Sequence, residues 1–244
     1  MTRSFDRTPA QMRPVTIEPD YVKYPAGAAL VTFGDTRVLC TVTIEESVPG
    51  FLRDRQPPQG WLTAEYALMP ASGLTRNPRA GYSGQVKGRV HEIQRLIGRS
   101  LRAVLDLTKV GPRTIYIDCD VLQADGGTRT AAINGAMVAL RIAMGRLQRS
   151  GKITENPIIS EVAAISVGVV KGTVMMDLDY REDSTAETDL NLVMTRTGGM
   201  VEVQGTAEHG VFSRQQLDAM LALGESGITQ LFKMHDEAVA RARP

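Results

Sequence analysis

The sequence predicts an α+β domain built from mixed sheets and packed helices, on three observations. The chain has 244 residues, the length of one large domain or two small ones. Segments with strand-like patterns are interleaved with helical segments along the whole chain, and no linker separates them. We therefore expect a single domain over 1–244. The hairpin-first layout of 13–150 and 158–240 suggests an ancient internal duplication.

In the first half, Val, Leu and Thr content predicts strands at 28–33 and 37–45, joined by a tight turn. A third strand is predicted at 61–68. The segment 70–87 carries Pro, Gly, Ser and Asn without periodicity. Its length is typical of a mobile or functional loop.

Two helices are predicted around a further strand. Apolar residues recur with helical spacing over 90–107, and 115–122 alternates as a strand. A glycine-rich loop then leads into a helix at 128–149, whose many small residues allow close packing on a sheet.

The second half begins with two predicted hairpins. The first joins strands 161–170 and 173–178, and the second joins 189–195 and 200–204.

A last helix is predicted to begin at a capping box, Ser213 with Gln216. Its apolar residues follow, and Gly224 and Gly227 mark possible breaks.

Composition excludes several classes of protein. Hydrophobic residues make up 43% and charged residues 23%, as in ordinary globular domains and unlike disordered chains, collagens or coiled coils. No apolar run reaches the roughly 18 residues of a membrane span, and 1–14 lacks the apolar stretch of a secretory signal. The two cysteines, Cys40 and Cys119, are too few for a disulfide scaffold. We expect a cytoplasmic protein.

Charge is concentrated in two blocks although the net charge is only +1. The basic block, 76–102, has seven bases and one acid; the acidic block, 177–189, has six acids and one arginine. Such blocks make strong local fields, or they are two solvated faces.

The strand-to-helix loop Asp125-Gly126-Gly127-Thr128-Arg129-Thr130 is a candidate anion site. Glycines let backbone N–H groups converge, and a helix N-terminus favours negative charge. The alternative is a simple turn capped by threonine. No GxxxxGK[ST] pattern occurs, so the loop is not a nucleotide P-loop.

Carboxylates spaced along the acidic block can converge on a hard cation such as Mg²⁺ or Mn²⁺. These are Asp177, Asp179, Asp183 and Asp189. The alternative is an acidic surface turn.

Basic residues favour a second anion site and an approach path. Arg89 begins a predicted helix, and Arg76 and Arg79 lie in the long loop, where they could reach the phosphates of a flexible ligand. The histidines are scattered along the chain and are not spaced as metal ligands usually are. Two anion sites, a metal site and a basic path together suit phosphoryl or nucleotidyl transfer on a polyanion.

Several motifs resemble the ribonuclease PH family, from about Arg13 to Ile228. They are Arg13-Pro14-Val15, Phe33-Gly34-Asp35-Thr36-Arg37-Val38-Leu39-Cys40-Thr41, Gly60-Trp61-Leu62-Thr63-Ala64-Glu65-Tyr66, Glu92-Ile93-Gln94-Arg95-Leu96-Ile97-Gly98-Arg99, the segment Asp118 to Thr130, Glu182-Asp183-Ser184 and Gln204-Gly205-Thr206.

The resemblance implies a phosphate-dependent 3′→5′ exoribonuclease that trims tRNA precursors and other RNA 3′ ends. Inorganic phosphate is the implied co-substrate, nucleoside diphosphates are the products, and the reaction is reversible. It also implies a homohexamer, a trimer of dimers, and a fold like domain 2 of a small-subunit ribosomal protein.

The resemblance assigns residues to this site. Phosphate binding falls on Arg89, Gly127, Thr128 and Arg129. Asp183 and Asp189 are implied as catalytic residues that hold Mg²⁺, with Mn²⁺ as another possible metal, and Asp189 is also expected to aid proton transfer. The basic residues expected to bind RNA are Arg76, Arg79, Arg95 and Arg99.

The sequence departs from the family pattern at two points. Arg79 is followed by Ala80-Gly81-Tyr82 instead of an acid, and Arg89 is followed by Val90 instead of threonine. A different reading is a non-catalytic RNA-binding subunit of a ring-shaped RNA-degrading assembly. The joint presence of Arg89, Arg129 and the two acids favours the enzyme. The missing nucleotide loop argues against a third reading, a small-molecule kinase.

Overall fold

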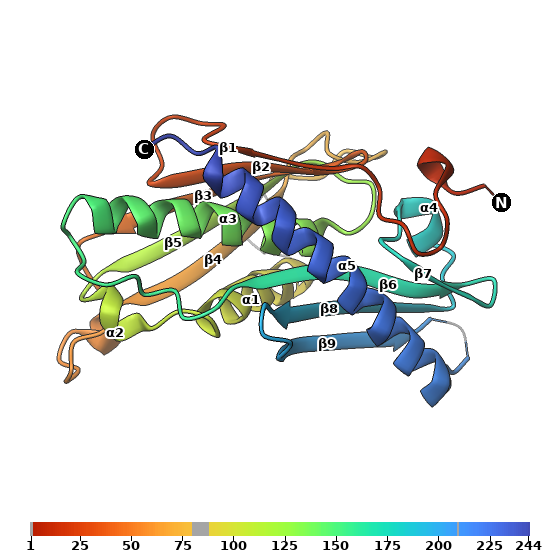
Figure 1. Ribbon diagram of the computed structural model, residues 1–244. Helices are drawn as coiled ribbons and strands as arrows, with labels where there is room; N and C mark the ends of the chain where they lie inside the picture. The colour runs from red at the N-terminus through yellow and green to blue at the C-terminus, as the bar shows by residue number, and fades with distance from the viewer. Residues whose placement is uncertain (1, 80–87, 209) are drawn as a thin grey trace.

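The computed structural model describes residues 2–79, 88–208 and 210–244 (Figure 1). A five-stranded sheet has the order β1-β2-β3-β5-β4, in which β4 pairs with β5 in parallel and the other neighbours are antiparallel. Its strands are β1 (Val15–Pro19), β2 (Gly27–Phe33), β3 (Thr36–Glu45), β4 (Trp61–Leu68) and β5 (Thr114–Gln123).

A four-stranded antiparallel sheet has the order β7-β6-β8-β9. Its strands are β6 (Val162–Val170), β7 (Thr173–Met176), β8 (Thr188–Thr195) and β9 (Met200–Ala207). The helices are α1 (Gly88–Arg102), α2 (Leu107–Val110), α3 (Thr128–Arg149), α4 (Tyr180–Asp183) and α5 (Arg214–Ala240), with short 3₁₀ turns η1 (Ser4–Asp6) and η2 (Gly50–Leu52).

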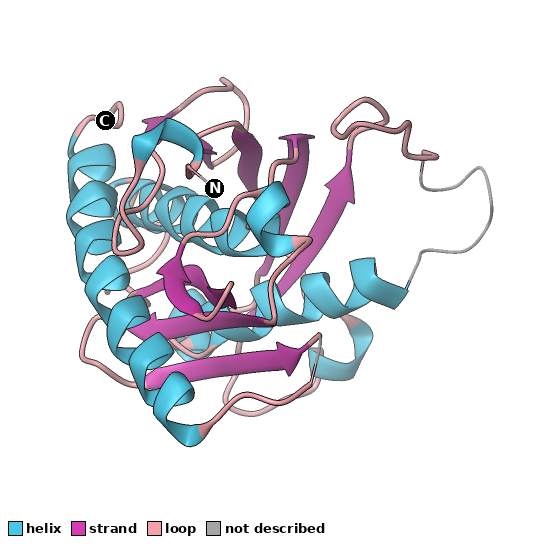
Figure 2. Ribbon diagram, turned by 90° about the vertical axis from the view of Figure 1, so that its right-hand side faces the viewer, coloured by secondary structure: helices cyan, strands magenta, loops and turns pink. Residues whose placement is uncertain are grey.

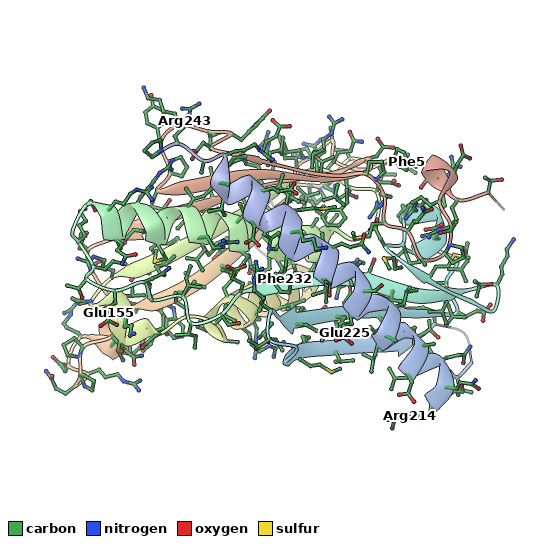
Figure 3. The ribbon with its side chains drawn as sticks, viewed as in Figure 1. Phe5, Glu155, Arg214, Glu225, Phe232 and Arg243 are labelled. Carbon is green, nitrogen blue, oxygen red and sulfur yellow. The ribbon has the colours of Figure 1, made fainter. Side chains whose placement is uncertain are left out.

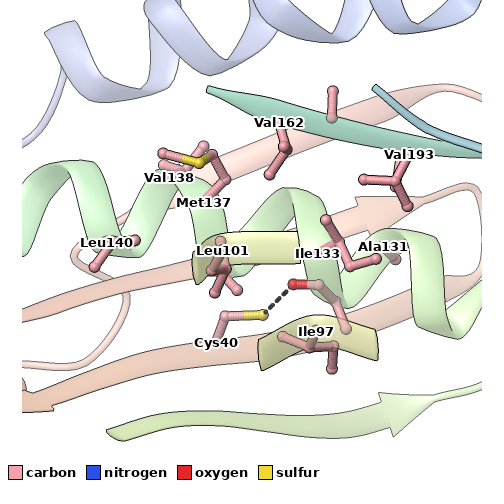
Figure 4. Close-up of a cluster of buried hydrophobic side chains, with 14 of the residues drawn as sticks. Cys40, Ile97, Leu101, Ala131, Ile133, Met137, Val138, Leu140, Val162 and Val193 are labelled. Carbon is pink, nitrogen blue, oxygen red and sulfur yellow. Dashed lines mark hydrogen bonds between the residues drawn. The ribbon is translucent and has the colours of Figure 1, made fainter. Parts of the chain in front are cut away.

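Helix α3 lies at the centre of the molecule and packs against β2 and β3 on one side and β6 on the other. Its small residues permit this. A Cβ at Gly135 would lie 2.7 Å from Cys40 Sγ, and the Cys40 thiol donates to the backbone oxygen of Ala132 at 3.5 Å (Figure 4). The buried Asn134 amide donates to and accepts from the backbone of Ala164 in β6. The two sheets therefore share one continuous core.

Helix α5 runs along one side of the molecule, across the second sheet and up to β1 (Figure 2). Figure 3 marks its course with Arg214 at one end and Arg243 just past the other. The expected breaks at Gly224 and Gly227 are absent from this helix. A Cβ there would lie 2.7 Å from Leu192 Cδ2 and 2.5 Å from Ile165 Cδ1, so both glycines serve close packing.

The strand and helix predictions are largely confirmed, with local corrections. The sequence missed β1 and the short α4. The predicted helix 90–107 ends at Arg102, because Leu105 bridges to Ile158 and Asp106 caps the separate helix α2. The last strand runs on to Ala207.

The predicted α+β fold class is confirmed. The predicted internal duplication stays a prediction. Within the described ranges, none of the helices is long and apolar enough to span a bilayer.

Candidate active site

The loop before α3 presents the helix N-terminus to the site. Gly126 and Gly127 have φ values of 76° and 65°, in the left-handed region that favours glycine. Thr128 and Arg129 form the first turn of α3, so backbone N–H groups without helical partners lie beside the Arg129 side chain. This geometry suits an anion.

Two buried residues that the sequence did not assign hold this loop. Thr36 Oγ1 donates to the backbone oxygen of Gly126 at 2.7 Å and accepts from the N–H of Asp125 at 3.0 Å. The Arg13 guanidinium donates to the backbone oxygen of Asp125. The candidate anion-binding loop is thus fixed from outside its own segment.

The loop also contacts the segment that leads into α4. A Cβ on Gly126 would lie 2.7 Å from the Asp179 carbonyl carbon and from the Leu178 backbone oxygen. Only glycine permits this approach, which fixes the start of α4 beside the loop. Asp183 ends that helix.

Asp177 and Asp179, two of the four carboxylates that could converge on a cation, are held by other partners. Arg13 and Arg7 lie 2.7 and 3.5 Å from the Asp177 carboxylate. Asp179 caps α4 by accepting from Glu182 N, and it also accepts from the Ser4 hydroxyl. The N-terminal segment, which lies beside α4 in Figure 1, neutralises the first part of the acidic block.

Asp183 and Asp189 are the acids that remain at the site. Burial, and after it the neighbouring Asp183 carboxylate, raise the pKa of Asp189 to about 6, while Arg129 opposes the shift. Burial also raises the pKa of Asp183, against the lowering effect of Arg89 and then Arg129. The two predicted acids and two predicted arginines therefore interact electrostatically. Glu208, which the sequence did not assign, adds negative charge near both acids.

These acids fit Mg²⁺. In the part of the chain that the structure describes, no group of three or more His, Cys, Asp or Glu side chains is arranged to hold a metal ion. A Mg²⁺ ion at Asp183 and Asp189 would have these two carboxylates as its protein ligands. Mg²⁺ commonly binds through one or two carboxylates together with waters and substrate phosphates.

Tyr66 adds a hydroxyl to the candidate anion site. Its Oη lies 2.8 Å from Thr128 Oγ1, in hydrogen-bond contact. Burial raises the pKa of Tyr66, whereas Thr128, Arg89 and Arg129 act to lower it, which puts the phenol close to both arginines.

The Arg129 guanidinium has two side-chain partners. Nη1 donates to Gln204 Oε1 at 2.7 Å and to Glu92 Oε1 at 3.2 Å, and Gln204 Nε2 donates to the same Glu92 oxygen at 2.8 Å. The sequence gave neither partner a role. Glu92 follows Arg89 by three residues on α1, a spacing that places both on one helix face and could have indicated it.

The four residues expected to bind RNA lie on exposed surface. Arg76 and Arg79 are on the segment before α1, and Arg95 and Arg99 are on α1, where Arg99 pairs with Glu202 at 3.0 Å. Among the described contacts, none joins these four to the acids.

Of the two departures from the family pattern, only the one at Val90 lies within the described residues. Ala80-Gly81-Tyr82 lies outside the described residues. Val90 is half-buried and packs against the core, so its methyl groups support the start of α1.

The 3′ exoribonuclease family accounts for most of the chain. Residues 11–144 match the model of its domain 1, and residues 160–227 match that of its domain 2.

Known structures share the fold. Rrp46 from rice (Oryza sativa) has a TM-score of 0.77 and 22% identity, over 98% of this chain and 100% of that one. The Archaeoglobus fulgidus exosome with RNA bound to the active site has a TM-score of 0.79 and 21% identity, over 95% and 91% of the two chains. An archaeal exosome core has a TM-score of 0.74 and 20% identity, over 94% and 89%.

Proposed function

The chain belongs to the 3′ exoribonuclease family, and from that membership we propose that it is a phosphorolytic 3′→5′ exoribonuclease. Its substrates are the 3′ ends of tRNA precursors and other RNA, and its products are nucleoside diphosphates. The reverse reaction adds nucleotides from nucleoside diphosphates.

One observation carries the proposal: four separate elements bring two arginines and two acids together, so that Arg89 and Arg129 act to lower the pKa of Asp183, while Asp183 raises and Arg129 lowers the pKa of Asp189. Two cations suit an anionic nucleophile, and two acids suit a metal ion. A protein that only binds RNA would need the basic groups but has no evident use for two half-buried carboxylates facing them.

The chemistry follows from this charge pattern. Hydrogen phosphate binds to Arg89, Arg129 and the N-terminus of α3, and its oxygen attacks the last phosphodiester of RNA. The new P–O bond forms as the bond to the 3′ oxygen breaks. The phosphate proton passes to the leaving 3′ oxygen, with Asp189 as the proposed proton carrier. One phosphodiester becomes one phosphoanhydride, so charge and atoms balance without water.

Asp183 and Asp189 would hold Mg²⁺, or Mn²⁺ in its place. The ion would supply positive charge where negative charge develops at phosphorus and at the leaving oxygen. Without it, the two acids would repel the phosphates of RNA, so their placement favours a metal-dependent reaction.

RNA as the substrate is supported by the related exosome structure with RNA bound to the active site. In this proposal the exposed residues Arg76, Arg79, Arg95 and Arg99 contact the RNA backbone. The working assembly is a homohexamer, a trimer of dimers.

The test is to incubate the protein with 3′-labelled RNA, Mg²⁺ and phosphate, and to identify the released nucleotide. We expect nucleoside diphosphates only when phosphate is present, and chain growth when nucleoside diphosphate replaces phosphate. Nucleoside monophosphates in phosphate-free buffer would indicate a hydrolase. RNA binding without release would favour a non-catalytic subunit. Sedimentation of the active species tests the hexamer.

A further inference from the structure

The Arg129 guanidinium is bridged to a carboxylate that the proposed reaction does not use. Glu92 from α1 and Gln204 from β9 both contact its Nη1, and they also contact each other. The Arg129 side chain is 15% exposed and that of Glu92 is 46% exposed. The three side chains form a closed triangle that we call the Arg129 clamp.

We propose that Gln204 and Glu92 are positioning residues that set the affinity of the site for inorganic phosphate, with opposite signs. Gln204 holds the guanidinium in place through a neutral acceptor. Glu92 orients the same guanidinium but lowers its affinity for an anion. The inference rests on the proposed function, in which Arg129 binds phosphate.

Elementary electrostatics explains why Gln204 and Glu92 have opposite effects on the affinity for phosphate. A guanidinium has five N–H donors in a fixed plane, so a contact at one nitrogen fixes the direction of the others. Gln204 fixes that direction without charge, and its loss lets Arg129 turn away. Glu92 carries a full negative charge within hydrogen-bond distance of the same nitrogen, so phosphate binds against its repulsion.

Repulsion between Glu92 and a bound anion favours release of the product in a reversible reaction. The product carries a diphosphate, which has more negative charge than inorganic phosphate. A carboxylate beside the anion site disfavours the more highly charged group, and Glu92 therefore speeds product release. The clamp orients Arg129 and at the same time prevents its binding of anions from becoming too tight.

The test uses Glu92→Gln and Gln204→Ala, because they separate charge from contact. Gln at 92 keeps an oxygen that accepts from Arg129 and from Gln204, but it has no charge. We expect the KM for phosphate to fall about two- to fivefold, in the range of an exposed ion pair. With Gln204→Ala we expect it to rise about tenfold, as for a lost hydrogen bond to a charged group. At saturating phosphate the single-turnover rate of the phosphorolysis step should stay within about twofold in both variants, because both act on the affinity for the anion.

Calorimetric titration with phosphate alone, without RNA, provides a second readout. The dissociation constants should change in the same directions. Asp218→Asn is the matched control, since it removes a carboxylate from the exposed pair with Arg214 on α5. It should leave phosphate affinity unchanged. Urea unfolding of each variant shows whether Gln204→Ala folds; if it does not, Glu92→Gln alone decides.

An unchanged or raised KM for phosphate in Glu92→Gln overturns the inference, even if the wild type is fully phosphorolytic. Equal effects of both variants on kcat, with KM unchanged, would indicate a merely structural triangle. The proposed function fails separately, if the wild type shortens RNA without phosphate. In that case tighter phosphate binding by Glu92→Gln would still support the clamp as an anion-tuning device.

Discussion

Arg13 Nη2 lies 2.7 Å from Asp177 Oδ1, and this ion pair joins the two halves of the site. The side chains are 0% and 3% exposed. Arg13 also donates to the backbone oxygen of Asp125, at the anion-binding loop, while Asp177 precedes the segment that carries Asp183. Burial acts to raise the pKa of Asp177, but Arg13 overrides it and lowers that pKa below its usual value. A buried pair therefore fixes the loop before α3 relative to the segment that carries Asp183.

We first predict that Asp177→Asn destabilises the protein by about 3–5 kcal/mol, because it leaves the buried Arg13 without its acid. Asparagine tolerates the left-handed backbone found here, φ 53°, so the charge is the main change. Urea unfolding at neutral pH measures the effect. Asp218→Asn, in an exposed pair, should cost no more than about 1 kcal/mol. Equal losses in the two variants would refute the role of the buried pair.

The second prediction compares two glycines with the same backbone requirement. Gly126 and Gly172 have φ values of 76° and 71°, but only at Gly126 would a Cβ meet other atoms within 4 Å. Gly172→Ala should cost about 1 kcal/mol of backbone strain and leave activity intact. Gly126→Ala adds overpacking of about 1–3 kcal/mol and displaces the loop from α4. We expect a higher KM for phosphate in Gly126→Ala alone, measured by initial rates over a phosphate series.

The third prediction concerns pH and the buried His235. Its Nε2 lies 3.1 Å from Asn134 Oδ1. Burial, with Arg141 and Arg196, lowers the pKa of His235 to about 3. Below about pH 6.5 the unfolded chain takes up a proton that the folded chain refuses. Stability is therefore fully present above about 6.5 and is lost as pH falls, by up to about 1.4 kcal/mol per pH unit.

His235→Gln cannot titrate, so it isolates this effect. The variant is less stable at pH 7, but its free-energy difference from wild type should shrink by about 2 kcal/mol between pH 7 and pH 5. Urea unfolding at three pH values gives the difference directly. Parallel curves for the two proteins would show that the ring does not titrate as stated.

The sequence predicted those parts of the site that sit on regular elements. Thr128 to Arg149 is a run rich in small residues after a glycine-rich loop, and the structure has α3 with those bounds. Local patterns could not show that Asp177 forms an ion pair with Arg13. The two residues are separated by 164 positions, and their pairing depends on how the N-terminal segment folds back. For the same reason Gln204, which is 75 residues from Arg129, was missed as its partner. Long-range polar contacts leave no periodic signal, whereas buried apolar faces do.

The fourth prediction concerns the basic loop. Replacing Arg76 and Arg79 with Ala should weaken RNA binding and reduce its salt dependence by up to roughly two phosphate contacts. Affinity for free phosphate should not change, because both residues are exposed and lie outside the anion site. The slope of log affinity against log salt for single-stranded RNA measures the loss. Lys171→Ala with Lys233→Ala removes two exposed charges elsewhere, and an equal loss there would indicate a non-specific charge effect.

The last prediction separates metal binding from RNA binding. Asp183→Asn and Asp189→Asn keep the shape of the side chains but remove the charge that would hold Mg²⁺. Metal stabilisation of the transition state contributes several kcal/mol, so we expect single-turnover rates to fall by roughly 10² or more. RNA binding should persist, and it should tighten slightly as negative charge leaves the site. Neither variant should be less stable than wild type, because burial raises the pKa of both acids, and Asp183 also raises that of Asp189.

A Mg²⁺ titration of Asp189→Asn that is folded and has the same assembly state as wild type gives the decisive comparison. If the acid binds the metal, the half-saturating Mg²⁺ concentration rises, and excess Mg²⁺ restores part of the rate. If the acid serves only proton transfer, the rate falls by the same factor at every Mg²⁺ concentration. If the acid is only a polar side chain of a surface turn, the rate equals that of the wild type at ordinary Mg²⁺. That result would contradict the proposed role of Asp189 in metal binding. Because Asn191 Nδ2 contacts Asp189 Oδ2 at 3.3 Å, Asn191→Ala should shift the Mg²⁺ dependence in the same direction but less, through loss of orientation and of a hydrogen bond that lowers the pKa of Asp189.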